Sequence, residues 1–464
     1  MVVVFVLVAV AVVTLLAGVH RYLWRRLVGD TTAPGSALRR AGTVAAFVLP
    51  LLSVGAMVSG RAGAPFRLQQ VLAWPGFLWL ASLLYLTLAL LVGEAVRPVL
   101  RRVLAHRDRA AAAARQPAPA VRADVGTEPR TDAKDRNDVL VPSGAPARPS
   151  PAAERDAAAD AGPTPERTVT ERTAPGPAAP GPTAAPSLAL PSRRLFVARA
   201  VGGAAAVAGL GTVGYGTYGV LRGPRVERVT VPIAKLPRSA HGYRVAVVSD
   251  IHIGPILGRA HTRRIVDTIN RTRPDLIAVV GDLVDGSVAD LGTAAEPLAG
   301  LRARHGSYFV TGNHEYFSGA AQWVDHVREL GLRPLENARV EIDGFDLAGV
   351  NDVAGESEGE GPDFVRALGD RDRSRASVLL AHQPVVIHDA VDYGVDLQLS
   401  GHTHGGQLWP GNFLAGLANP TVAGLERYGD TQLYVSRGAG AWGPPVRVGA
   451  QSDITVVELA SRQA

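Results

Sequence analysis

The stretch Arg244-Val245-Ala246-Val247-Val248-Ser249-Asp250-Ile251-His252 joins an apolar run to two polar side chains. β-Branched residues dominate the run, which predicts a buried β-strand from Arg244 to Ser249. Residues two apart in an extended chain share a face, so Asp250 and His252 can reach one metal ion together. An Asp-x-His triplet is also common by chance, and a polar turn after a strand is the alternative explanation.

A second predicted strand, from Leu276 to Val280, leads into Gly281-Asp282. The two oxygens of the Asp282 carboxylate allow it to bridge two cations, and the preceding glycine permits a tight turn beside them. A Gly-Asp turn without any ligand role is the alternative.

A third predicted strand, from Ser307 to Thr311, leads into Gly312-Asn313-His314-Glu315. Asn313 offers a neutral amide oxygen as a ligand, and His314 lies beside it as a candidate general acid. This four-residue string is more specific than the first two motifs. A hydrogen-bonded loop histidine is its alternative.

Two later strands are followed by three more histidines. The strand from Ser377 to Ala381 precedes His382, which taken alone is better explained as a capped or packed side chain than as a ligand. The strand from Asp396 to Ser400 precedes Gly401-His402-Thr403-His404-Gly405-Gly406, in which two imidazoles are again two residues apart. The glycines allow close approach of a metal and a substrate. This is therefore the most specific single motif.

The order of the five motifs indicates more than any one of them. Each follows a predicted strand, and chance agreement of all five is far rarer than a single match. One more strand is predicted from Leu433 to Ser436. Alternating strands and helices predict an α/β layered domain with its loops gathered at the carboxyl ends of the strands. The predicted helices are Thr262–Arg271, Ala289–Arg302, Ala320–Leu330 and Asp363–Leu368.

The chain of 464 residues contains no cysteine, which excludes disulfides, thiolate metal sites and cysteine nucleophiles. A metal must therefore be held by His, Asp, Glu, Asn or water. This ligand set suits divalent ions such as Mn, Fe, Zn or Ni and leaves their identity open.

Uncharged apolar runs crowd the first hundred positions of the chain. Three of them are long enough to cross a bilayer as helices, at Val2–Val19, Ala41–Ser59 and Val71–Gly93. The first run lacks the basic start and the small-residue cleavage site of a signal peptide. The sequence therefore predicts a membrane region with three transmembrane helices over residues 1–102.

Residues 103–195 contain no aromatic side chain and are rich in Ala, Pro, Arg, Asp, Glu and Thr. Such a segment buries too little apolar area to offset an ordering cost of roughly 1–2 kcal/mol per residue. A disordered linker is predicted here.

The linker ends in Ser192-Arg193-Arg194-Leu195-Phe196-Val197, followed by an apolar run from Ala200 to Leu221. The pattern resembles a twin-arginine export signal and predicts a fourth span or signal anchor over residues 196–222. The alternative is that the arginines are simply the cytoplasmic flank of a fourth membrane helix. Both explanations put the same side in the cytoplasm, and a globular domain is predicted over residues 225–464.

The net charge of +6 could indicate nucleic-acid binding, but the Lys and Arg residues are scattered and many flank apolar spans. The positive-inside rule explains them better, and no nucleic-acid partner is expected. Basic clusters follow the first and third spans and precede the fourth. The rule therefore predicts that the globular domain lies outside the cytoplasmic membrane.

The ordered motifs resemble the calcineurin-like metallophosphoesterase superfamily, whose pattern is Asp-x-His, Gly-Asp, Gly-Asn-His-Glu/Asp, His and Gly-His-x-His. The resemblance covers about Arg225 to Ala464. Membrane helices ahead of such a domain, together with the strings at 281–286 and 401–407, are similar to the transmembrane branch of the superfamily. The implied fold is a four-layer α/β sandwich, in which two packed mixed sheets carry helices on both outer faces.

The resemblance also implies a role for each motif residue. It implies a first metal held by Asp250, His252, Asp282 and His404. It implies a second metal held by Asn313, His382 and His402, with Asp282 as the bridge. His314 matches the position that contacts the phosphate and protonates the leaving oxygen.

The implied function is a membrane-anchored phosphoesterase that hydrolyses a phosphomonoester or phosphodiester by two-metal activation of water. A lipid-linked or envelope phosphoester is the expected substrate, because the helices hold the site near headgroups. The alternative is a non-catalytic membrane protein that keeps the scaffold for binding. Its signature would be a missing ligand or a missing His314, and neither is missing.

Residues outside the motifs carry weaker expectations. Asp285 is a candidate for orienting a ligand, with a plain loop acid as the alternative. Gln407, Trp409 and Pro410 are candidates for lining the substrate mouth. The remaining histidines of the domain are expected to be surface or packing residues, namely His241, His261, His305, His326 and His388.

Overall fold

The computed structural model describes residues 2–115 and 192–463. Contacts divide the chain into two compact units, residues 1–105 together with 192–464, and residues 106–191. Both β-sheets, their outer helices and all candidate site residues belong to the first unit.

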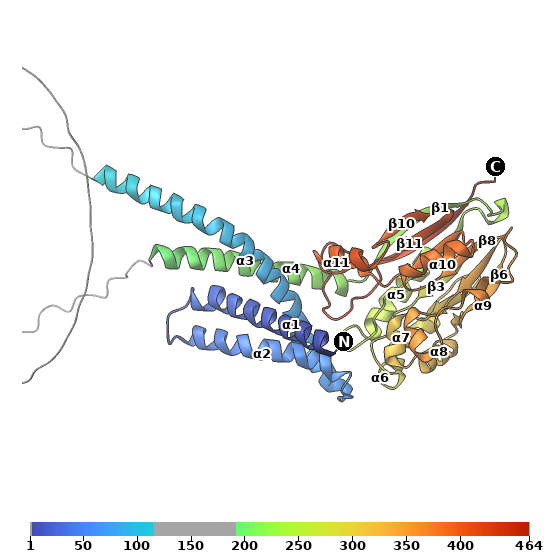
Figure 1. Cartoon of the computed structure of the whole chain (residues 1–464), viewed down its shortest axis with the longest axis horizontal. Coiled ribbons are helices and arrows are strands. Elements are labelled where there is room, and N and C mark those ends of the chain that lie inside the picture. Colours follow the sequence, from blue (N-terminus) through green and yellow to red (C-terminus); the bar gives the residue numbers. More distant parts are fainter. Residues whose placement is uncertain (1, 116–191, 464) are drawn as a thin grey trace, which may run out of the picture. The chain divides into compact units, whose positions relative to one another are not determined.

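Two six-stranded sheets form the domain that begins at Arg225 (Figure 1). The first sheet has the strand order β1-β12-β2-β3-β4-β5. From β2 to β5 neighbouring strands are parallel, whereas β12 is antiparallel to β2. The carboxyl ends of β2, β3 and β4 therefore meet at one edge of the sheet. The strands are Arg225–Ile233 (β1), Asp453–Ser461 (β12), Tyr243–Val248 (β2), Leu276–Val280 (β3), Ser307–Val310 (β4) and Arg333–Pro334 (β5).

The second sheet has the strand order β10-β11-β9-β8-β7-β6. Its four central strands run parallel, and the two edge strands are antiparallel to their neighbours. The strands are Gly424–Tyr428 (β10), Thr431–Val435 (β11), Leu397–Ser400 (β9), Ala376–Leu380 (β8), Phe345–Gly349 (β7) and Ala338–Ile342 (β6).

The inner core lies between the two sheets. Val245 and Val247 of β2 pack there with Leu347 of β7 and Val378 of β8. The alternate residues of β2, Ala246 and Val248, belong to a different cluster on the outer face of the first sheet. This alternation is the period of two that a buried strand requires.

Helices cover both outer faces (Figure 1). On the first sheet, Ile265 and Trp323 pack against Ile277 of β3. On the second sheet, Ile387 packs in a cluster with Leu379 of β8. The helices of the first sheet are α5 (Arg259–Thr272), α6 (Val288–Ala295) and α8 (Ala320–Glu329), and those of the second are α9 (Phe364–Leu368) and α10 (Ile387–Asp392).

The layers therefore run helix, sheet, sheet, helix, which confirms the predicted α/β class and the four-layer fold that the resemblance implied. One predicted helix is too long. The segment predicted as Ala289–Arg302 is α6 only to Ala295, and a 3-10 helix covers Glu296–Gly300. Pro297 lacks the backbone N–H that a continuing α-helix needs, and this explains the change.

Four helices of the described chain are long and apolar enough to cross a membrane, judged by length and composition. They include the four predicted spans. Their bounds are Val2–Leu23 (α1), Ala37–Ser59 (α2), Phe66–Arg115 (α3) and Arg193–Leu221 (α4), with a π-helical turn at Trp24–Gly29 after α1.

Both ends of the predicted linker at residues 103–195 are helical, which corrects its boundaries. Helix α3 continues to Arg115 and α4 begins at Arg193. The alanine run at 110–114 explains the longer α3, because alanine has the highest helix propensity. The rest of the predicted linker, residues 116–191, lies outside the described residues.

Candidate metal centre

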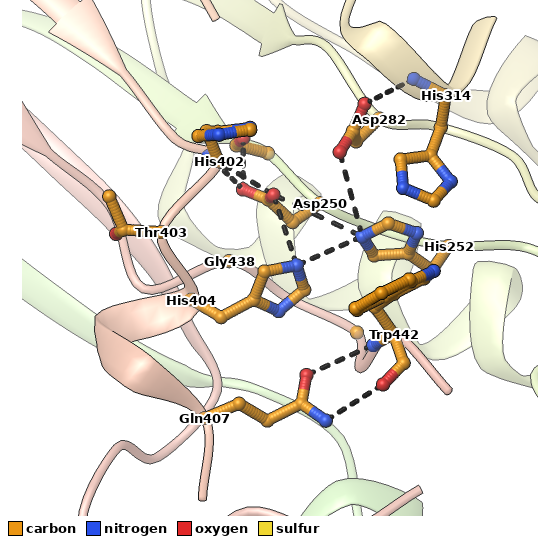
Figure 2. Close-up of polar contacts among 12 residues, drawn as sticks. Asp250, His252, Asp282, His314, His402, Thr403, His404, Gln407, Gly438 and Trp442 are labelled. Carbon is orange, nitrogen blue, oxygen red and sulfur yellow. Dashed lines mark hydrogen bonds and ion pairs between the residues drawn. The ribbon is translucent and has the colours of Figure 1, made fainter. Parts of the chain in front are cut away.

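The five sequence motifs meet at the carboxyl ends of the central strands of both sheets. Asp250 follows β2, Asp282 follows β3 and Asn313 begins the short helix α7 (Asn313–Ser318) just after β4. His382 follows β8, and His402 and His404 follow β9. The structure thus brings all eight candidate site residues into one place, with two sheets contributing ligands from opposite sides. Figure 2 shows six of these residues with their polar groups turned toward one another.

One group of side chains contains Asp250, His252 and His404. The Nε2 atoms of His252 and His404 lie 3.0 Å apart, and His404 Nε2 lies 3.3 Å from Asp250 Oδ1. Asp282 Oδ2 lies 3.8 Å from His252 Nε2. These four side chains are those that the resemblance assigned to a first metal.

A second group contains Asp282, His382 and His402. Asp282 Oδ2 lies 3.2 Å from His382 Nε2, and Asn313 Oδ1 lies 3.0 Å from His402 Nδ1. Asp282 belongs to the second group and also forms a third group with His252 and His314, so its carboxylate lies near imidazoles of both sets. This is the position expected of a bridging ligand.

The residues fit the binding of divalent cations. His382 Nδ1 donates a hydrogen bond to the carbonyl of Val280 across 2.9 Å, which turns Nε2 of the ring toward Asp282. That buried atom faces Asp282 but has no hydrogen-bond partner within the described chain. Burial by itself lowers the pKa of His382, but the Asp282 carboxylate outweighs it and raises the pKa well above the ordinary value. Positive charge is therefore favoured at this point, and a metal ion supplies such a charge.

Electrostatics lead to the same conclusion. Burial by itself lowers the pKa of His252, but Asp285, Asp282 and Asp250 outweigh it and raise the pKa to about 9. Burial raises the pKa of Asp282, yet the charges of His382 and His252 hold its net pKa well below the ordinary value. The carboxylates therefore create a strongly negative potential at the point where the imidazoles meet, as a cation site requires.

The backbone of the predicted ligands is strained. Five of them lie in the left-handed region, with φ of 53° at Asp250, 49° at His252, 50° at Asp282, 71° at His402 and 54° at His404. Such a conformation is uncommon for residues other than glycine, and it concentrates at functional sites. The strand ends turn sharply in order to direct these side chains inward.

The glycines of the motifs permit close approach of neighbouring loops. A Cβ added at Gly401 would lie 1.7 Å from Ser249 Oγ and 2.4 Å from Asp250 Oδ2. A Cβ added at Gly312 would lie 2.3 Å from Asp282 Oδ1. No side chain fits at either position without moving a candidate ligand.

Asp285 orients two histidines of the site, as one of its two sequence interpretations predicted. Its Oδ1 lies 2.9 Å from His252 Nδ1 and 2.7 Å from His314 Nδ1. Burial raises the pKa of Asp285, but the two histidines outweigh it and lower the pKa to about 2. The ionised carboxylate therefore accepts from both rings and leaves each Nε2 directed elsewhere.

Glu315 is a supporting residue to which the sequence alone gave no role. It is fully buried and accepts hydrogen bonds from the backbone N–H groups of Asp282 at 3.0 Å, Leu283 at 2.8 Å and Gly312 at 2.6 Å. Burial, and then the charge of Asp282, raise its pKa to about 7. Glu315 thereby ties the loop after β3 to the loop after β4.

Arg447 is a second supporting residue to which the sequence alone gave no role. It is only 4% exposed, and its Nη2 lies 2.9 Å from His404 Nδ1. It also donates to the carbonyls of Gly440 and Arg437, at 2.7 Å and 2.6 Å. The residue lies 43 positions beyond His404 in no recognisable motif, so no sequence signal could have found it.

The residues predicted to line the substrate mouth lie in the loop that follows the last histidine motif, namely Gln407, Trp409 and Pro410. Gln407 exchanges two hydrogen bonds with the backbone of Trp442, at 2.9 Å and 3.0 Å (Figure 2). The ring centre of Trp442 lies 5.7 Å from that of His314, and the ring centre of Phe317 lies 5.5 Å from it. Both aromatic side chains are more than half exposed. Aromatic surface therefore flanks His314 where solvent reaches the site.

Residues 243–406 match the calcineurin-like phosphoesterase family. An uncharacterized metallophosphoesterase from Aquifex aeolicus is 35% identical over 240 residues, which are 51% of this chain and 91% of that protein. The chain therefore belongs to the calcineurin-like phosphoesterases, and the superfamily predicted from the motifs is confirmed.

Two other relatives are named as transmembrane proteins. A transmembrane protein with metallophosphoesterase domain from Danio rerio is 39% identical over 250 residues, and its counterpart from Bos taurus is 39% identical over 253. The match covers 51% of this chain and 57% of each relative, so it spans little more than half their length.

Among solved structures, a dimetal phosphatase from Danio rerio is 12% identical. It aligns over 47% of this chain and 93% of its own length, with a TM-score of 0.33.

Proposed function

We propose that the chain is a membrane-anchored, metal-dependent phosphoester hydrolase that uses two divalent cations to activate water. One observation carries the proposal, namely that Asp282 Oδ2 lies 3.8 Å from His252 Nε2 and 3.2 Å from His382 Nε2. A single carboxylate oxygen thus serves two ligand groups. Family membership supports the same class of reaction.

In this proposal the ligands divide into two sets. Asp250, His252, Asp282 and His404 hold one cation, and Asp282, Asn313, His382 and His402 hold the other. Bound cations of this kind lower the pKa of water and stabilise the attacking and leaving oxygens of an in-line displacement. The protein's own contribution is to fix the ligands through Asp285, Glu315 and Arg447.

His314 is proposed to act outside the two ligand sets as the general acid. Its Nδ1–H is held by Asp285 at 2.7 Å, so Nε2 is the atom that remains to serve the substrate. Its side chain is 14% exposed, whereas those of His252 and His382 are fully buried. A substrate can therefore reach His314, which is proposed to donate a proton to the leaving oxygen.

A lipid-linked phosphoester is the proposed substrate class. The short helix α11 (Gly411–Ala418) begins five residues after the last glycine of the Gly-His-Thr-His-Gly-Gly motif. Its Phe413, Leu414 and Leu417 are 66%, 71% and 85% exposed. Water-facing apolar side chains beside a phosphoester site suit a substrate that carries acyl chains.

A contact to the membrane helices supports this substrate class. The hydroxyl of Tyr85 in α3 donates a hydrogen bond to the carbonyl of Trp409 across 3.0 Å. Trp409 lies two residues before α11 and is 51% exposed. The loop that carries the apolar side chains is thus attached to a proposed membrane span.

The proposed orientation has the domain at residues 225–464 on the outer side of the cytoplasmic membrane. Arginines gather after α1, in the second half of α3 and at the start of α4. The positive-inside rule assigns those helix ends to the cytoplasm, so the carboxyl end of α4 faces outward.

The proposal can be tested with the full-length protein in detergent. We expect purified protein to contain about two divalent ions per chain and to hydrolyse members of a panel of phosphomonoesters, phosphodiesters and lipid-linked phosphoesters. Asp282→Ala should remove both metal and activity. His388→Gln is the matched control, because His388 is an exposed histidine of α10 and is none of the candidate ligands.

Two results would overturn parts of the proposal. A metal-replete protein inactive on the whole panel would favour the non-catalytic binding role. Faster hydrolysis of soluble nucleotides than of any lipid-linked substrate would remove the lipid assignment and leave the metal chemistry intact.

A further inference from the structure

A cavity of about 680 Å³ lies among the helices α3 and α4 and the π-helical turn after α1. Six arginines line it, and none of the candidate metal ligands does. A smaller cavity of about 250 Å³ shares four of these arginines and adds Asp30 and Ser192. The arginines are Arg25, Arg26, Arg97, Arg101, Arg193 and Arg194.

The lining is strongly cationic even after the local ion pairs are considered. The two cavities contain two carboxylates, Glu94 and Asp30. Arg26 occupies both, with contacts of 2.9 Å to Glu94 and 3.0 Å to Asp30. Arg193 is left out of this balance. The two carboxylates balance at most two of the five positive charges of Arg25, Arg26, Arg97, Arg101 and Arg194, so the lining keeps a net positive charge that favours an anion.

Arg97 shows where an anion would be held. It is only 4% exposed, although it lines both cavities. Its Nη1 lies 3.6 Å from Glu94 and 3.9 Å from Asp30, too far for hydrogen bonds. Its Nε and Nη2 have no hydrogen-bond partner within the part of the chain that the structure describes. A buried guanidinium with two unused donors in a cavity wall is suited to a ligand with acceptor oxygens.

The amino end of α4 adds to the positive potential. Ser192 caps this helix of 29 residues, and Ser192, Arg193 and Arg194 all belong to the cavity linings. The first backbone N–H groups of a helix carry partial positive charge and favour anions, phosphate above all.

We propose that this cavity binds the phosphate of an anionic phospholipid headgroup. Guanidinium groups match phosphate oxygens in pairs, and basic pockets between membrane helices suit acidic headgroups. Pro98, Leu104 and Val197 supply apolar lining beside the arginines. The cavity lies where the apolar spans meet their arginine flanks, at the depth of headgroups, so a lipid reaches it more directly than a soluble anion does.

The test uses the full chain in detergent with added phosphatidylglycerol, phosphatidylcholine or inorganic phosphate. Bound lipid is counted by native mass spectrometry, and thermal unfolding is measured in parallel. We expect phosphatidylglycerol to be retained about tenfold better than phosphatidylcholine and to raise the unfolding temperature.

Arg97→Gln should reduce retention of phosphatidylglycerol. Because Arg97 is buried and its loss could disturb packing, Arg101→Gln with Arg194→Gln is the second variant, since both side chains are exposed. That pair should lower retention about tenfold. Arg102→Gln with Arg107→Gln is the matched control, because these exposed arginines of α3 do not line the cavity and should change nothing.

Three results would overturn the proposal. Equal retention of the two lipids would exclude a site for an anionic headgroup. Stabilisation by inorganic phosphate equal to that by phosphatidylglycerol would identify a site for the free ion. Equal losses of phosphatidylglycerol retention in the cavity and control variants would mean that general surface charge, and not the cavity, holds the lipid.

Discussion

His314 Nδ1 lies 2.7 Å from Asp285 Oδ1, and the same oxygen lies 2.9 Å from His252 Nδ1. One carboxylate therefore orients both a proposed metal ligand and the proposed general acid. Asp285 lies three residues beyond Asp282, so a single loop after β3 supplies the proposed bridge and its supporting carboxylate.

Asp285→Asn should reduce kcat by about 10- to 100-fold and weaken metal binding, because the amide keeps the shape but not the charge. Metal content and steady-state kinetics measure the two effects separately. Asp430→Asn is the control, since Asp430 is an exposed acid of the β10–β11 turn. A normal rate with a normal metal content would mean that Asp285 has no positioning role.

His314→Gln should keep both metals and lose rate in a manner that depends on the leaving group. A general acid matters most when the departing oxygen is strongly basic. We therefore expect about a 100-fold loss with an alkyl phosphoester and a much smaller loss with a p-nitrophenyl ester. An equal loss with both esters, or a loss of metal, would contradict the assignment.

Gly401→Ala should unfold or demetallate the site, because the added Cβ would lie 1.7 Å from Ser249 Oγ. We expect a fall of about 3 kcal/mol in the free energy of unfolding, together with loss of metal. Urea unfolding and metal analysis measure these changes. Gly258→Ala is the control, since a Cβ at Gly258 meets no atom within 4 Å.

His261 should make the domain sensitive to acid. The ring is 1% exposed, and neither of its nitrogens has a hydrogen-bond partner within the described chain. Burial, with smaller contributions from Arg264 and Arg447, lowers its pKa from 6.5 to about 3. The unfolded chain therefore binds a proton below pH 6.5 that the folded chain refuses until about pH 3, so stability falls as the pH falls through this window.

Because of His261, the free energy of unfolding should fall by about 2 kcal/mol between pH 7 and pH 5. His261→Leu should remove that difference, which urea unfolding at the two pH values measures. His388→Gln, at an exposed histidine, should leave it unchanged. An unchanged pH dependence in His261→Leu would show that other groups cause the acid sensitivity.

The sequence predicted the central strands, because apolar runs are local signals. It also predicted that the eight candidate site residues follow strands, and the structure has them at those positions. Val245 and Val247 alternate with Ala246 and Val248 in a pattern that any buried strand shows. The polar residues that follow such strands gather at the sheet edge by topology alone.

Contacts between distant segments could not be predicted in this way. Strand β12 separates β1 from β2 although it lies more than 200 residues later in the chain. Edge strand β10 is largely exposed and gives little apolar signal. The supporting roles of Glu315 and Arg447 depend on side chains that meet backbone groups of other loops, and residue spacing does not encode such meetings.

The left-handed backbone at five proposed ligands has a consequence for the life of the protein in the cell. Each such residue costs about 1–3 kcal/mol, against a total stability of about 5–15 kcal/mol for an ordinary domain. Bound cations would offset much of that cost. We therefore expect metal starvation to lower the abundance of the protein through proteolysis, well before it limits the turnover of the molecules that survive.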